Sequence, residues 1–287
     1  MRPDDMNKLP VVAFVGVGTM AEAMIGCALA GGWPRERILL THRRDDRRAE
    51  LKARFGGKIG EDNLAATRAA DIVVLGVRPQ ESEALIQSLR PALRAGQTLV
   101  SIAAALTVDW LRARLPAGMT VVRITPPPTI RVKAGVALIS THGDIGLVVR
   151  DSIERLVKNA CERIEWLPDV LMEPVTGMAM GLTPYVCMLL STLIKTGIEQ
   201  GIEPGFARRM VMDGMWATAW LLHRGGYTPE QILEMVATRE GLTWSSLRTM
   251  EALGVPQGIR AGARAMTGRS YELRGEPVPL DYRGFKT

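Results

Sequence analysis

The sequence contains few of the residues that bind metals or form disulfides. Its 287 residues include three histidines and three cysteines, and Cys27, Cys161 and Cys187 lie far apart along the chain. Without a Cys-x-x-Cys pair or a Cys/His cluster, neither a structural zinc site nor a disulfide scaffold is expected. We therefore expect reduced thiols, a cytoplasmic location and no bound metal.

Long runs of one charge are also absent. The formal net charge is +6, and the charges are scattered apart from the cluster Arg43, Arg44, Arg47 and Arg48. No zinc finger, basic zipper or aromatic RNA-binding strand is present, so we do not expect nucleic acid as a partner. The basic excess favours an anionic small molecule instead.

One segment is free of charge and long enough to cross a bilayer. Residues 174–194 contain no Asp, Glu, Lys or Arg, but several Thr, Ser, Gly and Pro residues interrupt their apolar character. Lys195 is the only adjacent basic residue, whereas membrane spans usually carry a basic cluster. A helix that is apolar on all sides is also typical of a buried subunit interface. The polar N-terminus is not a signal peptide, and we expect no membrane association.

The beginning of the chain has the pattern of a dinucleotide-binding unit. Residues 9–15 are a short apolar run typical of a buried parallel strand, and a helical segment follows the glycine turn. Gly16 permits the tight turn, Gly18 lets the backbone approach a pyrophosphate, and Ala21 keeps the helix close to the strand. The helix N-terminus then offers free N–H groups to the phosphates.

The end of the second expected strand, 37–41, indicates which dinucleotide is bound. NAD enzymes usually place Asp or Glu there to bind the ribose 2′-hydroxyl. This chain instead continues with His42, Arg43 and Arg44, and the first carboxylate after the strand is that of Asp45. Arginine suits a 2′-phosphate through charge-assisted hydrogen bonds. The alternative is an ordinary solvated helix start.

Further apolar runs alternate with helical segments and predict the rest of the fold. The expected strands are 71–77, 98–103, 120–124 and 135–140. This alternation predicts an α/β Rossmann domain with a doubly wound, mostly parallel sheet. Ligands bind beyond the carboxyl ends of such strands, which places Gly16, Arg78, Ala103 and Pro126 near one crevice.

Strand-like runs end at about Trp166, and the remaining chain has helical spacing rich in Met, Leu, Ala and Gly. At about 100–200 residues per domain, the length allows two domains. We expect a Rossmann domain over 1–166, an all-α dimerisation and substrate domain over 167–273, and a tail over 274–287.

Several segments taken together resemble one family. They are FVGVGTMAEAMIGCALAGG (14–32), DIVVLGVRPQ (71–80), LVSIAAALT (99–107), VVRITPPPT (121–129) and EPVTGMAMGLTPYV (173–186). The chain resembles the pyrroline-5-carboxylate reductases, the last enzymes of proline synthesis. The resemblance implies hydride transfer from NADPH to a small cyclic imine. It also implies a homodimer formed through the helical domain, or a larger oligomer.

The resemblance assigns most of the cofactor site by position. The residues that correspond to the family's NADP-binding segments are Gly16, Gly18, Thr19, Met20, Ala21, Thr41, His42, Arg43, Val77, Arg78, Pro79, Ser101, Ala103 and Ala104. Among them, Ser101, Ala103 and Ala104 correspond to the segment near the nicotinamide.

A late loop corresponds to the family's substrate site. The family typically has Ser-Pro-Gly-Gly-Thr-Thr where this chain has Thr238-Arg239-Glu240-Gly241-Leu242-Thr243. The resemblance assigns substrate binding to Thr238, Arg239, Gly241 and Thr243, and it places the Thr243 hydroxyl beside the imine nitrogen as the catalytic group. From the residues alone, Thr243 is equally an ordinary helix N-cap.

The substrate side departs from the family in three places. Pro127 stands where the family has asparagine, and Met180-Gly181-Leu182-Thr183 replaces a Gly-Ser-Gly-Pro helix start. In the late loop, Glu240 replaces a glycine and is expected to restrict the backbone, and Leu242 replaces a threonine hydroxyl. We therefore expect poor reduction of pyrroline-5-carboxylate and better reduction of another imine.

Two further hypotheses are compatible with the sequence. One is a non-catalytic NADP-binding regulatory protein derived from such an enzyme. The other is a β-hydroxyacid-dehydrogenase-like oxidoreductase, which needs a catalytic lysine in the helical domain. Lys195 is the only lysine between Lys158 and Lys286.

Overall fold

A computed structural model describes residues 9–282 and divides the chain into two compact units. The first unit comprises the chain up to Thr176 together with Thr267–Leu280, and the second contains Gly177–Met266. The expected domains divide instead near Trp166 and end at Leu273. The difference arises because the chain returns to the first unit at Thr267.

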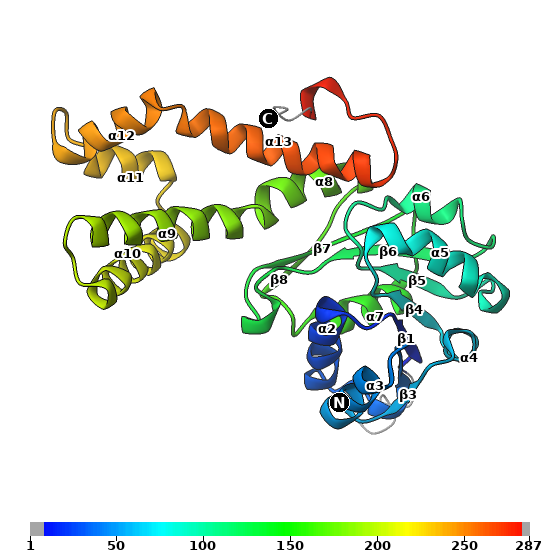
Figure 1. Ribbon diagram of the computed structural model, residues 1–287. Helices are drawn as coiled ribbons and strands as arrows, with labels where there is room; N and C mark the ends of the chain where they lie inside the picture. The colour runs from blue at the N-terminus through cyan, green and yellow to red at the C-terminus, as the bar shows by residue number, and fades with distance from the viewer. Residues whose placement is uncertain (1–8, 283–287) are drawn as a thin grey trace. The chain divides into compact units, whose positions relative to one another are not determined.

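The first unit is built on one eight-stranded sheet with the order β3-β2-β1-β4-β5-β6-β7-β8 (Figure 1). The strands are β1 Val12–Val15, β2 Ile38–Thr41, β3 Lys58–Gly60, β4 Ile72–Leu75, β5 Thr98–Ser101, β6 Thr120–Thr125, β7 Val136–Thr141 and β8 Arg163–Trp166. All neighbours are parallel except β6 and β7. The expected mostly parallel, doubly wound fold is confirmed.

Alternation along the central strand β1 explains why helices cover both faces of the sheet. Val12 and Phe14 belong to one buried cluster, and Ala13 and Val15 belong to the other. Successive side chains of a strand point to opposite faces, so a strand apolar at every position must be covered on both sides. The helices of this unit are α2 Thr19–Ala30, α3 Asp45–Phe55, α4 Asn63–Ala69, α5 Pro79–Leu89, α6 Val108–Arg112, α7 Leu147–Val157 and the short α8 Met172–Val175.

The second unit is helical throughout its regular structure, as expected. A π-helical segment, Thr176–Met180, precedes its first long helix. The helices that follow are α9 Leu182–Glu199, α10 Pro204–Arg224, α11 Pro229–Val236, α12 Leu242–Ala252 and α13 Val255–Leu273. Helices α9 and α10 lie side by side (Figure 1).

The second unit has almost no apolar core of its own. Helices α9, α11 and α12 contain no buried residue, and α10 buries only Ala207. One helical stretch, Asp169–Glu199, is long and apolar enough to cross a membrane by length and composition, and 17% of its most apolar window is buried. These helices therefore carry a large exposed apolar surface.

The stretch expected to be a tail begins with a residue whose side chain is buried. The Arg274 side chain is 3% exposed and donates a hydrogen bond to the carbonyl oxygen of Ala105 at 2.6 Å. Residues 274–280 therefore belong to the first unit, which corrects the expected tail at this end. Residues 283–287 lie outside the described part of the chain.

Candidate functional site

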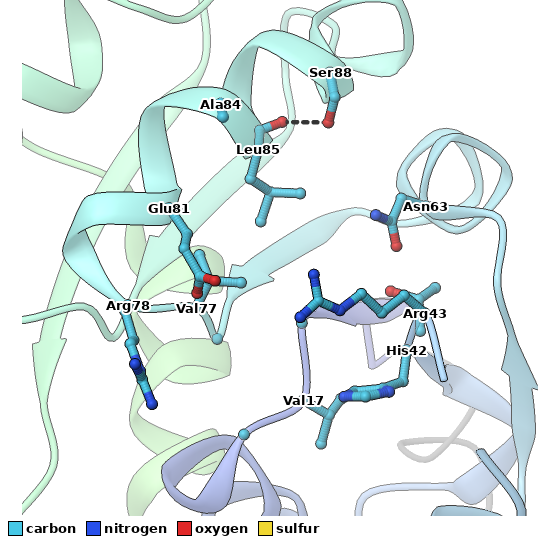
Figure 2. Close-up of a pocket in the computed structure, with 14 residues that line it drawn as sticks. Val17, His42, Arg43, Asn63, Val77, Arg78, Glu81, Ala84, Leu85 and Ser88 are labelled. Carbon is cyan, nitrogen blue, oxygen red and sulfur yellow. Dashed lines mark hydrogen bonds between the residues drawn. The ribbon is translucent and has the colours of Figure 1, made fainter. Parts of the chain in front are cut away.

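A cavity of about 480 Å³ lies in the first unit beside the carboxyl ends of β1, β2 and β4 (Figure 2). It contains seven of the residues assigned to the cofactor from the sequence, namely Gly16, Gly18, Thr41, His42, Arg43, Val77 and Arg78. Its position beyond the strand ends is where open α/β sheets bind ligands.

Glycines let the chain segments after β1 and β4 approach one another closely. Gly16 has a φ of 77°, and a Cβ atom there would lie 2.3 Å from Cγ1 of Val77. A Cβ on Gly76 would lie 2.4 Å from the carbonyl oxygen of Gly16 and 3.0 Å from Cβ of Ala21. Larger residues at these places would separate helix α2 from the sheet, in agreement with the predicted role of Ala21.

The N-terminus of helix α2 is suited to hold phosphate. Gly18 is the N-cap, and no side chain among the described residues caps this end. The first amides of a helix have no partner within the helix, and together they carry a partial positive charge. The exposed turn Gly18-Thr19 thus presents donors that fit a pyrophosphate.

The part of the cavity wall that follows β2 contains a cation with no ion-pair partner in the described part of the chain. Arg43 lines the cavity, and its side chain extends into it (Figure 2). Arg44 instead hydrogen-bonds to Asp46 through Nε at 3.0 Å, and this bond lowers the pKa of the Asp46 carboxyl. Arg44 does not line the cavity, so the expected pair of cations is reduced to Arg43.

Arg48 holds the segment that presents His42 and Arg43. Its Nη1 donates to the carbonyl oxygens of His42 at 2.9 Å and Arg43 at 3.2 Å. Arg48 also pairs with Asp45 and, at 3.4 Å, with Glu61. The first acidic residues after β2 are therefore ion-paired with arginines and do not line the cavity.

Seven assigned cofactor residues lie outside the wall of this cavity. They are Thr19, Met20, Ala21, Pro79, Ser101, Ala103 and Ala104. Ser101 is fully buried at the end of β5 and accepts a hydrogen bond from the amide of Ala103 at 3.3 Å, whereas Ala104 is exposed. The assignment of Ser101, Ala103 and Ala104 to the nicotinamide end stays a prediction.

Several residues of the cavity wall were not expected from the sequence. They are Val17, Asn63, Gly76, Glu81, Ala84, Leu85 and Ser88. Gly76 could have been found, because it is the glycine that ends the apolar run 71–75. Asn63 begins α4 and Glu81 lies on α5, and only the order of strands in the sheet brings these helices beside β1 and β2.

In the second unit the late loop forms a tight turn before α12. The amide of Gly241 donates to the carbonyl oxygen of Thr238 at 2.9 Å, and a Cβ on Gly241 would lie 2.7 Å from Oγ1 of Thr238. Glu240 has a φ of 62°, which is the left-handed conformation that glycine favours. Glu240 therefore adopts the backbone conformation favoured by the glycine that it replaces, which runs against the expected restriction.

Thr243 does not cap the helix that follows it. Gly241 is the N-cap of α12, and Thr243 is the second helical residue. Thr243 and its neighbour Leu242 are exposed, Leu242 to 94%. The interpretation of Thr243 as an N-cap is wrong, and its role toward an imine stays a prediction, as do those of Thr238, Arg239 and Gly241.

The lysine and the cysteines discussed from the sequence lie at positions that indicate no catalytic role. Lys195 lies exposed on α9. Cys27 and Cys161 are buried, and burial raises the pKa of both thiols, while Cys187 is exposed. Among residues 9–282, no group of three or more His, Cys, Asp or Glu side chains is arranged to hold a metal ion.

Two family models match the chain, one in each part. The model described as "NADP oxidoreductase coenzyme F420-dependent" matches residues 11–105, and the model described as "Pyrroline-5-carboxylate reductase dimerisation" matches residues 169–273. Together with the cavity after β1, these matches place the chain among the NAD(P)H-dependent oxidoreductases.

Relatives extend the match over nearly the whole length. Pyrroline-5-carboxylate reductase of Pseudomonas aeruginosa is 27% identical over 92% of this chain and 97% of its own length. Pyrroline-5-carboxylate reductase 3 of Bos taurus is 28% identical over 94% of this chain and 87% of its own length. Over nearly its whole length the chain is similar to the pyrroline-5-carboxylate reductases. A solved Plasmodium falciparum pyrroline carboxylate reductase with NADP bound has the same fold, with a TM-score of 0.82 at 15% identity over 92% of this chain and 98% of that one.

Proposed function

We propose that this protein is an NADPH-dependent reductase that transfers hydride to the C=N bond of a small cyclic imine, pyrroline-5-carboxylate or a related compound. The observation that carries the proposal is the dinucleotide cavity with Arg43 in its wall, in a chain that matches a pyrroline-5-carboxylate reductase over 92% of its length. The proposal places the protein in the cytoplasm and in proline biosynthesis.

The adenosine end of the cavity supports NADPH rather than NADH. Arg43 lies where an NAD enzyme has a carboxylate, and no acid among residues 9–282 pairs with its guanidinium. Asp45 and Asp46, the nearest acids along the chain, are paired with Arg48 and Arg44. A 2′-phosphate beside Arg43 therefore meets a cation, while the first two carboxylates after β2 are already paired with arginines.

Bound NADPH supplies the hydride, and the chain has to orient the cofactor and the imine. Gly16 and Gly18 let the backbone approach the pyrophosphate, and the N-terminus of α2 donates to it. We assign the imine nitrogen to the hydroxyl of Thr243, which has no hydrogen-bond partner among the described residues. Arg239 and the turn Thr238–Gly241 bind the remainder of the substrate.

The proposal includes a homodimer formed through the helical unit. Large apolar side chains remain exposed on α9 and α10, with Met188 64%, Trp216 63% and Trp220 54% exposed. Exposed apolar surface of this extent marks an interface between proteins. The matching dimerisation model spans these helices.

Matched substitutions at Thr243 test the assignment of the imine site. Thr243→Val keeps the shape of the side chain and removes the hydroxyl, and Thr243→Ser keeps the hydroxyl. We expect kcat/KM for the imine to fall about tenfold or more in the valine variant, because a hydrogen bond to a charged group is worth about 1.5–3 kcal/mol. The serine variant retains most of the activity. Equal kcat/KM values in Thr243→Val and the wild type would reject the role of the hydroxyl.

A further inference from the structure

Four charged side chains form a cluster beneath the turn that follows β5, outside the wall of the dinucleotide cavity. Arg123 on β6 is 4% exposed, Glu173 on α8 is 8% exposed and Arg274 is 3% exposed. Asp169, the fourth member, is 22% exposed. Buried charges are costly unless each of them is paired, so the cluster must be closed by its own contacts.

The contacts link the four side chains in one chain of ion pairs. Nη1 of Arg123 lies 2.7 Å from Oδ1 of Asp169, and its Nη2 lies 2.8 Å from Oε1 of Glu173. The same oxygen of Glu173 lies 3.4 Å from Nη1 of Arg274. Arg274 also pairs with Glu276 at 2.8 Å, which fixes its guanidinium from the other side.

The cluster holds the turn after β5 at two points. Arg274 donates through Nη1 to the carbonyl oxygen of Ala105 at 2.6 Å, and the amide of Val108 donates to Oδ2 of Asp169 at 2.8 Å. Ala105 has a φ of 73°. A non-glycine residue keeps this left-handed conformation only where its surroundings enforce it.

We propose that Arg274 is a positioning residue for hydride transfer, acting through the turn Ile102–Thr107. The proposal rests on the proposed function and on the sequence-based assignment of Ser101, Ala103 and Ala104 to the nicotinamide end of the cofactor. Arg274 fixes Ala105 in its left-handed conformation, and Ala105 fixes the exposed Ala104 beside it. Arg274 follows the second unit in sequence and Glu173 precedes it, so the segments leading into and out of the helices set the shape of this turn.

The test uses Arg274→Gln in the full chain with three measurements. The first is kcat with NADPH and a cyclic imine, and the second is the affinity for adenosine 2′,5′-bisphosphate, which fills only the adenosine end. The third is the fluorescence of the bound nicotinamide, which does not depend on turnover. We expect kcat to fall on the order of tenfold to a hundredfold, because small misplacements of reacting groups have effects of this size. The affinity for the bisphosphate should be unchanged, and the nicotinamide emission should shift.

Three further variants separate positioning from folding. Arg269→Gln removes an exposed arginine of α13 that pairs only locally with Glu272, so it should change none of the three measurements. Arg274→Lys retains one donor and should give an intermediate kcat. Ala105→Gly in the Arg274→Gln background should recover part of kcat, because glycine adopts a positive φ without steric cost.

Two results would overturn the proposal. One is an Arg274→Gln protein with unchanged kcat and nicotinamide emission. The other is a parallel loss of bisphosphate affinity and kcat, which would mean that Arg274 only supports the fold. If Arg274→Gln does not fold, Arg274→Lys with wild-type kcat and emission contradicts it equally. A wild type without imine turnover would defeat the proposed function alone, since the emission measurement still tests the positioning of the nicotinamide.

Discussion

At the scale of single residues, Arg43 and Arg44 are neighbours with different surroundings. Arg43 lines the dinucleotide cavity (Figure 2). Arg44 is hydrogen-bonded to Asp46 and is not part of the cavity wall. The sequence pattern treats the two as equivalent cations. The structure distinguishes them, and only Arg43 remains a candidate for binding the 2′-phosphate.

Because Arg43 and Arg44 differ in this way, substitution of Arg44 is a matched control for substitution of Arg43. We expect Arg43→Ala to weaken NADPH binding by about tenfold to a hundredfold, because a charge-assisted hydrogen bond contributes about 1.5–3 kcal/mol. NADH binding should hardly change, and Arg44→Ala should leave both affinities near those of the wild type. Fluorescence titration of both cofactors measures the effect. Equal affinities for NADPH and NADH in the wild type would contradict this assignment.

The backbone conformation of Glu240 leads to a second prediction at this scale. Its φ of 62° is unfavourable for a side chain with a Cβ, by about 1–2 kcal/mol. Glu240→Gly should therefore leave the free energy of unfolding unchanged or raise it by up to about 1 kcal/mol. Glu234→Gly, inside helix α11, should lower it by about 1 kcal/mol, because glycine is a poor helix residue. Urea titration compares the two, and equal losses of stability would contradict the left-handed conformation.

The conformation of Glu240 also bears on the expected substrate preference. One of the two reasons for expecting weak carboxylate binding was a restricted backbone, and Glu240 adopts the conformation that glycine favours. The other reason remains, because Leu242 provides no hydroxyl and is exposed. The preference for an imine other than pyrroline-5-carboxylate stays a prediction that depends on this one missing donor.

At the scale of elements, the sequence predicted the buried strands and missed the edge strands. The six expected strands correspond to β1, β2, β4, β5, β6 and β7, each of which contains a run of buried residues. β3 and β8 were not expected, because their residues are exposed or half-buried and alternate with charge, as in Arg163–Trp166. Periodicity reports burial, so strands at the two edges of a sheet give a weak signal.

The residues of the site that could be predicted are those that belong to local sequence patterns. Gly16, Gly18 and Arg43 belong to one strand-turn-helix motif or to the end of the next strand, and local spacing identifies such residues. Asn63 and Glu81 reach the cavity only through the strand order, which is a property of the whole sheet. The cluster of Arg123 and Arg274 joins residues far apart in sequence and gave no local signal.

The exposed apolar surface of the helices in the second unit predicts that the protein forms a dimer. Because α9, α11 and α12 bury no residue within the chain, we expect a stable dimer at micromolar concentration with a large apolar interface. Multi-angle light scattering across a dilution series measures this, with added salt as a control, since an apolar interface should not weaken as salt rises. A stable monomer at micromolar concentration would show that these helices are covered in another way.

At the scale of the whole molecule, the two units divide the proposed chemistry. The first unit contains the dinucleotide cavity and the buried charge cluster, and the second contains the loop with Thr243. The family match extends across both units, from 11–105 to 169–273. A non-catalytic regulatory protein needs only the first of these sites, so catalysis on an imine is the claim that separates the hypotheses.

The most direct test is steady-state kcat/KM with NADPH for a panel of cyclic imines. The panel contains pyrroline-5-carboxylate, a larger ring with a carboxylate and a ring without one. We expect NADPH-dependent reduction of at least one of them. We also expect kcat/KM for pyrroline-5-carboxylate to be about tenfold lower than for the best substrate, which is the effect of one lost hydrogen-bond donor. Tight NADPH binding without turnover of any imine would contradict the proposed reductase activity, and pyrroline-5-carboxylate as the best substrate would contradict the altered specificity.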